Sequence, residues 1–256
     1  MNRRIQVLLV YLGTLPLLWA EPDPGVGREA KFAALLTGHV RDGLVDYRAL
    51  AQNRVQLNQC LEAYAGVTDW EFNGWTVPER LAHLGNLYNL CVLKIVADDY
   101  PLRRIQQAGG WFSGDPFQWN VAPLMGHRIS LEILFRNYIR RDYAEPLMLF
   151  ALSPAARGGP PLRSEPYSAD RLYAQLDDQA KRFLSTAPYN RIDKDRRRVH
   201  LSQLFRKYGG DFERKYGSVK AFLNATAPAD WGRVDRYAIY YTDFDWRLND
   251  LATASK

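Results

Sequence analysis

The sequence has 256 residues, of which 47% are hydrophobic and 13% aromatic, so it can bury a sizeable core in one large domain or two small ones. This ordinary globular composition excludes a disordered or fibrous chain. The formal net charge of +6 indicates at most a weak affinity for anionic surfaces and excludes a typical nucleic-acid protein.

Residues 1–20 have the three-part layout of a secretory signal, with two arginines, an apolar run and a small residue at its end, Ala20. Pro16 interrupts the apolar run and argues against a permanent membrane span. Leu18 is a poor fit to a cleavage site, so an uncleaved N-terminal anchor stays as the alternative. We predict export to the periplasm or outside the cell, with a mature chain that starts near Glu21, carries a charge of +4 because two arginines and no acids are removed, and has no stable membrane span.

The N-terminal half has mostly helical patterns. We expect a Pro/Gly linker and an N-terminal helix over residues 21–39, and an Asp-Gly turn at residues 42–43. A second helical pattern covers residues 47–64. The clearest helix starts near Pro78 and has a wide apolar face as far as residue 95, so it is predicted to form the centre of the core.

The middle of the chain, residues 128–162, is the segment in which we expect a functional site. Turn residues at 125–127 predict a hairpin that leads into a helix capped by Ser130. Residues 147–152, which read LMLFAL, predict a short buried strand. A loop of small residues and prolines follows at 153–161, and loops at the ends of packed elements commonly carry functional groups.

The C-terminal half mixes helices and strands. Residues 167–184 and 217–225 predict helices, residues 207–212 a turn, and residues 237–246 an aromatic strand. The basic run 191–198 is either a solvated loop or an anion-binding patch. Together these patterns predict an α+β fold that is rich in helices and has a small, mostly antiparallel sheet.

Two cysteines exclude a cysteine-rich zinc cluster, and the four histidines show no ligand spacing, so no metal or cofactor is predicted. Export would permit Cys60 and Cys91 to pair, but both lie among apolar neighbours in helical patterns. Whether they form a disulfide therefore stays open.

Several segments, taken in order, resemble the family catalogued as domain of unknown function 547. They span residues 40–250 and leave residues 251–256 as a tail. The matching pieces are VRDGLVDYRAL (40–50), NLYNLCVLKIV (86–96), GHRISLEILFRNYIR (126–140), FALSPAARGGPPLRSEPY (150–167), LDDQAKRFL (176–184), VHLSQLFRKYGGDF (199–212) and IYYTDFDWRLND (239–250). The resemblance implies a papain-like or transglutaminase-like core with a cysteine, a histidine and an acidic residue in active members.

This chain departs from the family pattern at each of those positions. The family's Glu-His step falls on Phe135 and Arg136, its two loop cysteines fall on Pro154 and Gly159, and its loop asparagine falls on Ser153. A thiol mechanism needs a thiolate, a base and a group that orients the base. The resemblance therefore implies a divergent member whose site has lost its catalytic residues.

The leading hypothesis is a catalytically silent protein with a binding or structural role in the cell envelope, where its partner is a small anionic ligand or an envelope protein. A carboxylate or phosphate would be bound by Arg136, Ser153 and Arg157. In the alternative, the aliphatic part of the Arg136 side chain packs on the protein and its guanidinium lies in solvent without a ligand.

Two further classes of protein stay open. In one, Ser153 is a displaced nucleophile of a hydrolase or transferase, with His127 or His200 as its base and Asp243 or Asp245 to orient the base. In the other, the chain is a scaffold that binds a partner through the aromatic segment 111–119 or the basic run 191–198.

Overall fold

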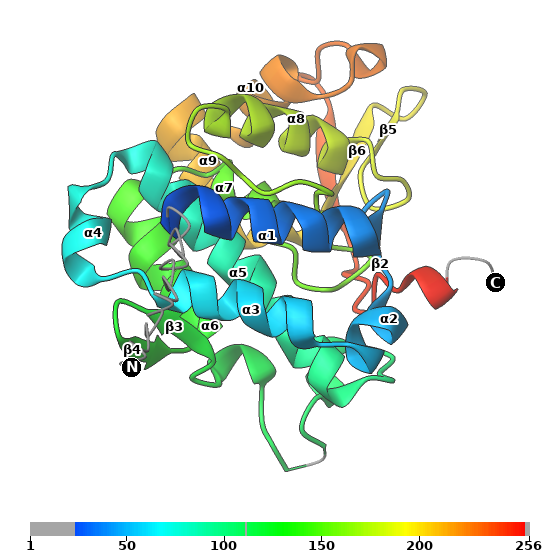
Figure 1. Cartoon of the computed structure of the whole chain (residues 1–256). Helices are drawn as coiled ribbons and strands as arrows, with labels where there is room; N and C mark the ends of the chain where they lie inside the picture. The colour runs from blue at the N-terminus through cyan, green and yellow to red at the C-terminus, as the bar shows by residue number, and fades with distance from the viewer. Residues whose placement is uncertain (1–23, 111, 254–256) are drawn as a thin grey trace, which may run out of the picture.

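The computed structural model describes residues 24–110 and 112–253 of the chain. In this part of the chain, helices pack around one long helix, and small sheets lie beside them (Figure 1). Two of the sheets are antiparallel hairpins, so the structure confirms the predicted α+β class with helices in the majority. The predicted signal, residues 1–20, lies outside the described residues.

The N-terminal half is helical, as predicted. Its helices are α1 (Pro24–His39), α2 (Tyr47–Gln52), α3 (Val55–Ala65), α4 (Asp69–Gly74) and α5 (Val77–Asp99). Helix α1 starts at Pro24, inside residues 21–27, which we expected to be the linker, so the predicted boundary between linker and helix was wrong. The single pattern predicted over residues 47–64 is two helices, because the backbone leaves the helical conformation at Asn53, the C-cap of α2. The predicted Asp-Gly turn joins β1 (Val40–Arg41) to β2 (Leu44–Val45), and Asp42 and Gly43 both have positive φ there.

Helix α5 forms the centre of the core, which confirms the prediction. A capping box of Thr76 and Glu79 starts it, and Pro78 lies in its first turn. Almost every side chain from Leu81 to Ala97 is buried. Helices α2 and α3 pack against it, as do α7 (Met148–Ala151) and α8 (Leu172–Leu184), so α5 supports the elements on both sides of the loop that follows α7.

The predicted hairpin and capped helix are also present. Strands β3 (Ala122–Leu124) and β4 (His127–Ile129) pair antiparallel, after the 3-10 turns η1 (Ile105–Gln107) and η2 (Pro116–Gln118). Ser130 Oγ accepts a hydrogen bond of 3.1 Å from the amide of Ile133, which confirms Ser130 as an N-cap. Helix α6 (Leu131–Ile133) then continues as a π-helix, η3 (Leu134–Arg141).

The predicted strand at residues 147–152 is wrong, because the run forms helix α7 (Met148–Ala151). The turn that leads into α7 begins at Glu145, whose carboxylate accepts a hydrogen bond from the amide of Leu147. Phe150 packs in a cluster of buried rings that includes Phe183, with the centroids 5.5 Å apart, and Phe205, at 5.9 Å. Periodicity cannot separate a buried strand from a buried helix in so short an apolar run.

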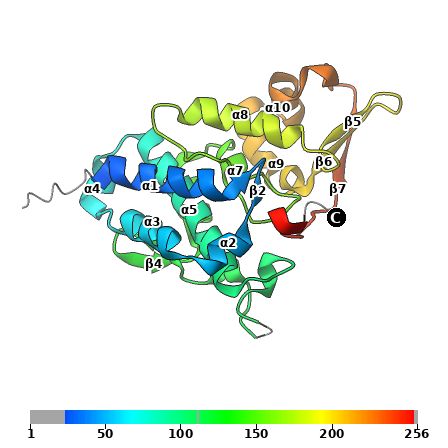
Figure 2. The same ribbon diagram turned by 45° about the vertical axis from the view of Figure 1, so that its right-hand side comes forward.

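The C-terminal half adds helices and the largest sheet. The elements are α8 (Leu172–Leu184), β5 (Arg191–Asp193), β6 (Arg198–Ser202), α9 (Gln203–Tyr216), α10 (Val219–Thr226), η4 (Ala229–Trp231), β7 (Ala238–Thr242) and η5 (Leu251–Thr253). The basic run 191–198 forms the β5–β6 hairpin, and β6 pairs parallel with β7. The predicted turn at 207–212 is wrong, because these residues lie within α9, which only kinks at Tyr208. Figure 2 shows the sheet at the far end of the molecule from α4.

Candidate functional site

Two asparagines of α5 hold the loop after α7 at both of its ends. The Nδ2 of Asn89 donates to the carbonyl of Ala151 at 2.9 Å, and its Oδ1 accepts from the amide of Ser153 at 2.9 Å. Asn86 bonds the amide and the carbonyl of Tyr167 in the same way, at 2.9 and 2.8 Å. Because the two asparagines are three residues apart on α5, they share one helix face. We call these contacts the amide clamp.

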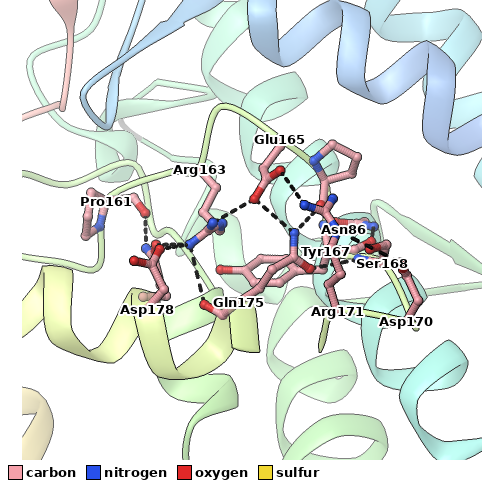
Figure 3. A network of polar contacts seen from close by, with 12 residues as sticks. Asn86, Pro161, Arg163, Glu165, Tyr167, Ser168, Asp170, Arg171, Gln175 and Asp178 are labelled. Atoms are coloured by element: carbon pink, nitrogen blue, oxygen red, sulfur yellow. Dashed lines mark hydrogen bonds and ion pairs between the residues drawn. The ribbon is translucent and has the colours of Figure 1, made fainter. Parts of the chain in front are cut away.

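Helix α8 holds the same loop from the other side (Figure 3). Gln175 accepts from the amide of Ser168 at 3.0 Å, and Gln179 donates to the carbonyl of Pro161. Arg163 is nearly buried and pairs with Glu165 at 2.7 Å and with Asp178 at 2.5 Å. Burial alone would lower the pKa of Arg163, but the hydrogen bonds that its guanidinium donates to these two carboxylates raise it.

The middle of the loop is attached to the C-terminal segment. The amide of Arg157 donates to the carbonyl of Arg247 at 2.9 Å, and the Arg157 guanidinium donates to the carbonyl of Thr253 at 2.8 Å. The amide of Gly158 donates to the carbonyl of Asp245, and a Cβ at Gly158 would lie 2.5 Å from the Asp245 nitrogen. The backbone approach at this point therefore requires glycine.

The two loop positions predicted to replace the family's cysteines are in contact with each other. A Cβ at Gly159 would lie 2.6 Å from Cγ and 2.7 Å from Cδ of Pro154. The amide of Gly159 donates to the carbonyl of Ala156 at 3.1 Å and closes a tight turn. Pro154 and Gly159 therefore form a packed pair in which neither residue has a nucleophile.

The two positions on η3 have other contacts. The ring of Phe135 lies edge-on to Tyr208, with the centroids 5.5 Å apart. The small cavity beside Phe135 has a volume of about 10 Å³, which is room for one water at most. Arg136 pairs with Glu132 on its own helix at 2.9 Å, and 64% of its side chain is exposed.

The structure brings Pro154 and Gly159 together, but it does not join the three residues expected to bind an anion. Among the described residues, no hydrogen bond or ion pair connects Arg136 with Ser153 or Arg157. Arg157 is already bonded to backbone carbonyls. The anion-binding role of these residues therefore stays a prediction.

The serine-nucleophile alternative has little geometric support. Ser153 is only 3% exposed, and in the described part of the chain no hydrogen bond joins its hydroxyl to a histidine or an acid. His127 is exposed on β4, and His200 stacks on Tyr240 of β7. Asp245 instead accepts from the Tyr189 hydroxyl at 2.6 Å and pairs with the exposed Arg247. The hydrogen bonds of Arg247 lower the pKa of Asp245 to about 2.

A groove with a volume of about 480 Å³ lies between α3, α5 and residues 119–128. Leu61, Ile95 and Trp119 give it apolar walls. Its charged lining comprises two cations, Arg128 and Lys94, and three carboxylates, Glu62, Asp98 and Asp99. Lys94 is paired with Asp98 at 2.5 Å, whereas Arg128 is exposed on β4. Three separate segments line the groove, so no local sequence motif indicates it.

Both cysteines are free and buried, which answers the open question about a disulfide. Burial raises the pKa of Cys60 to about 11 and that of Cys91, which lines the groove, to about 12. Neither thiol is activated for nucleophilic chemistry. Within residues 24–110 and 112–253, no cluster of three or more His, Cys, Asp or Glu side chains is arranged to hold a metal ion.

No helix in the described part of the chain has the length and apolar character that crossing a bilayer requires.

The fold and the loop define a helix-rich α+β protein with a buried, polar-clamped loop that contains no thiol. Residues 72–184, from α4 to the end of α8, match the model of the family described as "Protein of unknown function, DUF547". This match supports the assignment to that family of the segment that includes α5, the amide clamp and the loop. No curated protein and no solved structure matches the chain. The papain-like core implied by the resemblance therefore stays a prediction.

Proposed function

We propose that this protein is an exported, catalytically silent relative of its family, with a binding role in the cell envelope. The observation that carries the proposal is the packed pair of Pro154 and Gly159, at the loop positions where the resemblance places the family's cysteines. Pro154 has neither a nucleophile nor a backbone donor, so it cannot attack a substrate or contribute an amide to an oxyanion hole.

The residues around this pair support the same conclusion. Arg136 stands where the family has its histidine, and a guanidinium stays protonated and cannot act as a base near neutral pH. Phe135 stands at the acidic position and packs on Tyr208. The two buried cysteines belong to helices α3 and α5 rather than to the loop.

The groove between α3 and α5 provides a place for a small ligand. Its volume of about 480 Å³ falls in the usual range of small-molecule sites. The apolar walls would hold the body of such a ligand, and Arg128 would pair with its anionic end. Because Glu62, Asp98 and Asp99 also line the groove, such a ligand would carry its carboxylate, phosphate or sulfonate group at one end only, next to Arg128.

Catalytic silence is tested with a fluorophosphonate probe and an activated ester on the exported chain. We expect no covalent adduct by intact-mass measurement and no ester turnover above the rate in buffer. A stoichiometric adduct on Ser153 would instead establish a serine nucleophile and reject the proposal.

Ligand binding is tested with 1-anilinonaphthalene-8-sulfonate, which has an aromatic body and a sulfonate. We expect Arg128→Glu to weaken binding about fivefold, which corresponds to about 1 kcal/mol for one partly exposed charge contact. Arg206→Glu, an exposed change on α9, is the matched control and leaves the affinity unchanged. Equal effects of the two variants would exclude the groove.

Export is tested by fusing alkaline phosphatase, which becomes active only outside the cytoplasm, to the C-terminus of the full chain. We expect an active fusion and a mature N-terminus at or near Glu21 by N-terminal sequencing. An active fusion that keeps residues 1–20 would indicate the membrane-anchored alternative, and an inactive fusion would reject export.

A further inference from the structure

Strand β7 ends the three-stranded sheet, which has the order β5-β6-β7. Its five residues read AIYYT, and β6 is its partner on one side (Figure 2). In the described part of the chain, no strand pairs with its other side. Within the described residues, no backbone hydrogen bond outside the β6 pairing reaches Ile239 or Tyr241, and the strand is partly exposed.

The register shows which backbone groups face that open edge. The amide of Ala238 donates to the carbonyl of Arg197 at 2.9 Å, so Ala238 points toward β6. Backbone direction alternates along a strand, so Tyr240 and Thr242 also point toward β6. Ile239 and Tyr241 consequently direct their N–H and C=O groups outward.

The strand has none of the usual protection of a free edge. It contains no proline, no lysine and no inward-pointing charge, and its pairing with β6 runs without a bulge from Ala238 to Thr242. Tyr240 is 43% exposed and Tyr241 is 41% exposed, one on each face of the sheet. Such an edge is a template for the addition of another strand.

The charge beside this edge indicates what kind of segment it fits. The β5–β6 hairpin, residues 191–198, has a net charge of +3, but β5 lies on the far side of β6, so Arg198 on β6 is the cation of the hairpin that reaches β7. The guanidinium of Arg198 lies over the ring of Tyr240, 4.9 Å from its centroid, and so extends from β6 across β7. An added strand would place alternate side chains next to that guanidinium.

We propose that the outer edge of β7 binds an extended acidic peptide segment of a partner protein as a fourth strand. Ile239 and Tyr241 supply the backbone hydrogen bonds, and Arg198 pairs with a carboxylate of the incoming segment. A second copy of this chain fits less well, because its β7, AIYYT, offers no carboxylate to Arg198. The edge lies outside the Pro154–Gly159 turn, so this proposal goes beyond the proposed function.

The test uses a fluorescein-labelled peptide of alternating glutamate and valine, eight residues long, and fluorescence anisotropy with the full chain. We expect saturable binding that weakens as salt is added. A peptide of alternating lysine and valine, or the glutamate peptide N-methylated at alternate residues, should bind at least tenfold more weakly. Hydrogen exchange of the Ile239 and Tyr241 amides should slow when the glutamate peptide is bound.

A charge reversal of the protein tests the same contact. We expect Arg198→Glu to weaken the glutamate peptide at least tenfold, whereas Arg104→Glu, an exposed change after α5, leaves it unchanged. Circular dichroism confirms that both variants are folded. The absence of binding, equal binding of the N-methylated peptide, or self-association through β7 would each overturn the proposal. Failure of this strand-addition proposal would not affect the proposed catalytic silence of the loop, which the fluorophosphonate and ester experiments test separately.

Discussion

We predict that His83 makes the stability of this protein sensitive to acid. Its ring lies in α5, stacked on Tyr64 with the centroids 5.1 Å apart and edge-on to Trp75 at 5.1 Å. Neither ring nitrogen has a hydrogen-bond partner among the described residues. Burial, and secondly the charge of Arg28, lowers the pKa of His83 to about 3.

The size of the effect follows from this pKa. In the unfolded chain a histidine has a pKa of about 6.5, so at lower pH the unfolded state takes up a proton that the folded state does not. The contribution of His83 to stability is thus complete above pH 6.5 and is lost as the pH falls toward 3. Each unit in that window costs about 1.4 kcal/mol, so the free energy of unfolding should drop by about 2 kcal/mol between pH 7.5 and 5.0.

The measurement is urea unfolding, followed by circular dichroism, at pH 7.5 and 5.0. His83→Phe keeps an aromatic ring in place and removes the titrating group, so the variant should lose about 2 kcal/mol less than the wild-type protein over this interval. His127→Ala, which removes an exposed histidine, is the matched control and should lose as much as wild type. If His83→Phe is as acid-sensitive as wild type, the buried histidine is not the cause.

Three further predictions concern the loop and the thiols. Asn89→Ala leaves the carbonyl of Ala151 and the amide of Ser153 unpaired in the core, and it should destabilise the protein by about 2–4 kcal/mol in urea unfolding. Gly159→Ala should destabilise by about 1–3 kcal/mol through its clash with Pro154, and the double variant with Pro154→Ala should be more stable than Gly159→Ala alone. Cys60 and Cys91 should react slowly with a disulfide reagent in the folded protein and rapidly after unfolding.

Each of these predictions has a result that contradicts it. Asn58→Ala, in an exposed position of α3, is the control for Asn89→Ala. Equal losses in the free energy of unfolding would show that the amide clamp does not stabilise the fold. Additive effects of Pro154→Ala and Gly159→Ala would mean that the two residues do not press on each other. Immediate reaction of both thiols in the folded protein would show that they are accessible.

Much of the fold could be predicted from the sequence, because local chemistry determines it. The proline and the apolar face of α5, the cap at Ser130 and the Asp-Gly turn each depend on residues close together in the chain. Helix α7 could not be predicted, because its state depends on rings from α8 and α9 that lie far away in sequence.

The candidate site could be predicted less well. The sequence alone predicts that the loop at residues 153–161 is the candidate site and shows that it contains no thiol. The residues that hold the loop were missed, although carboxamides at positions 86, 89, 175 and 179 interrupt otherwise apolar helix faces at helical spacing. The groove was missed because its walls come from three separate segments.

The amide clamp also affects how freely the loop sequence can change during evolution. Asn86 and Asn89 bond only to backbone atoms of the loop, at Ala151, Ser153 and Tyr167. Every amino acid except proline offers the same N–H and C=O groups at those positions. Substitutions at these clamped positions can therefore accumulate without altering the path of the chain, whereas the close contacts of Gly158 and Gly159 leave the turn between those positions little freedom to change.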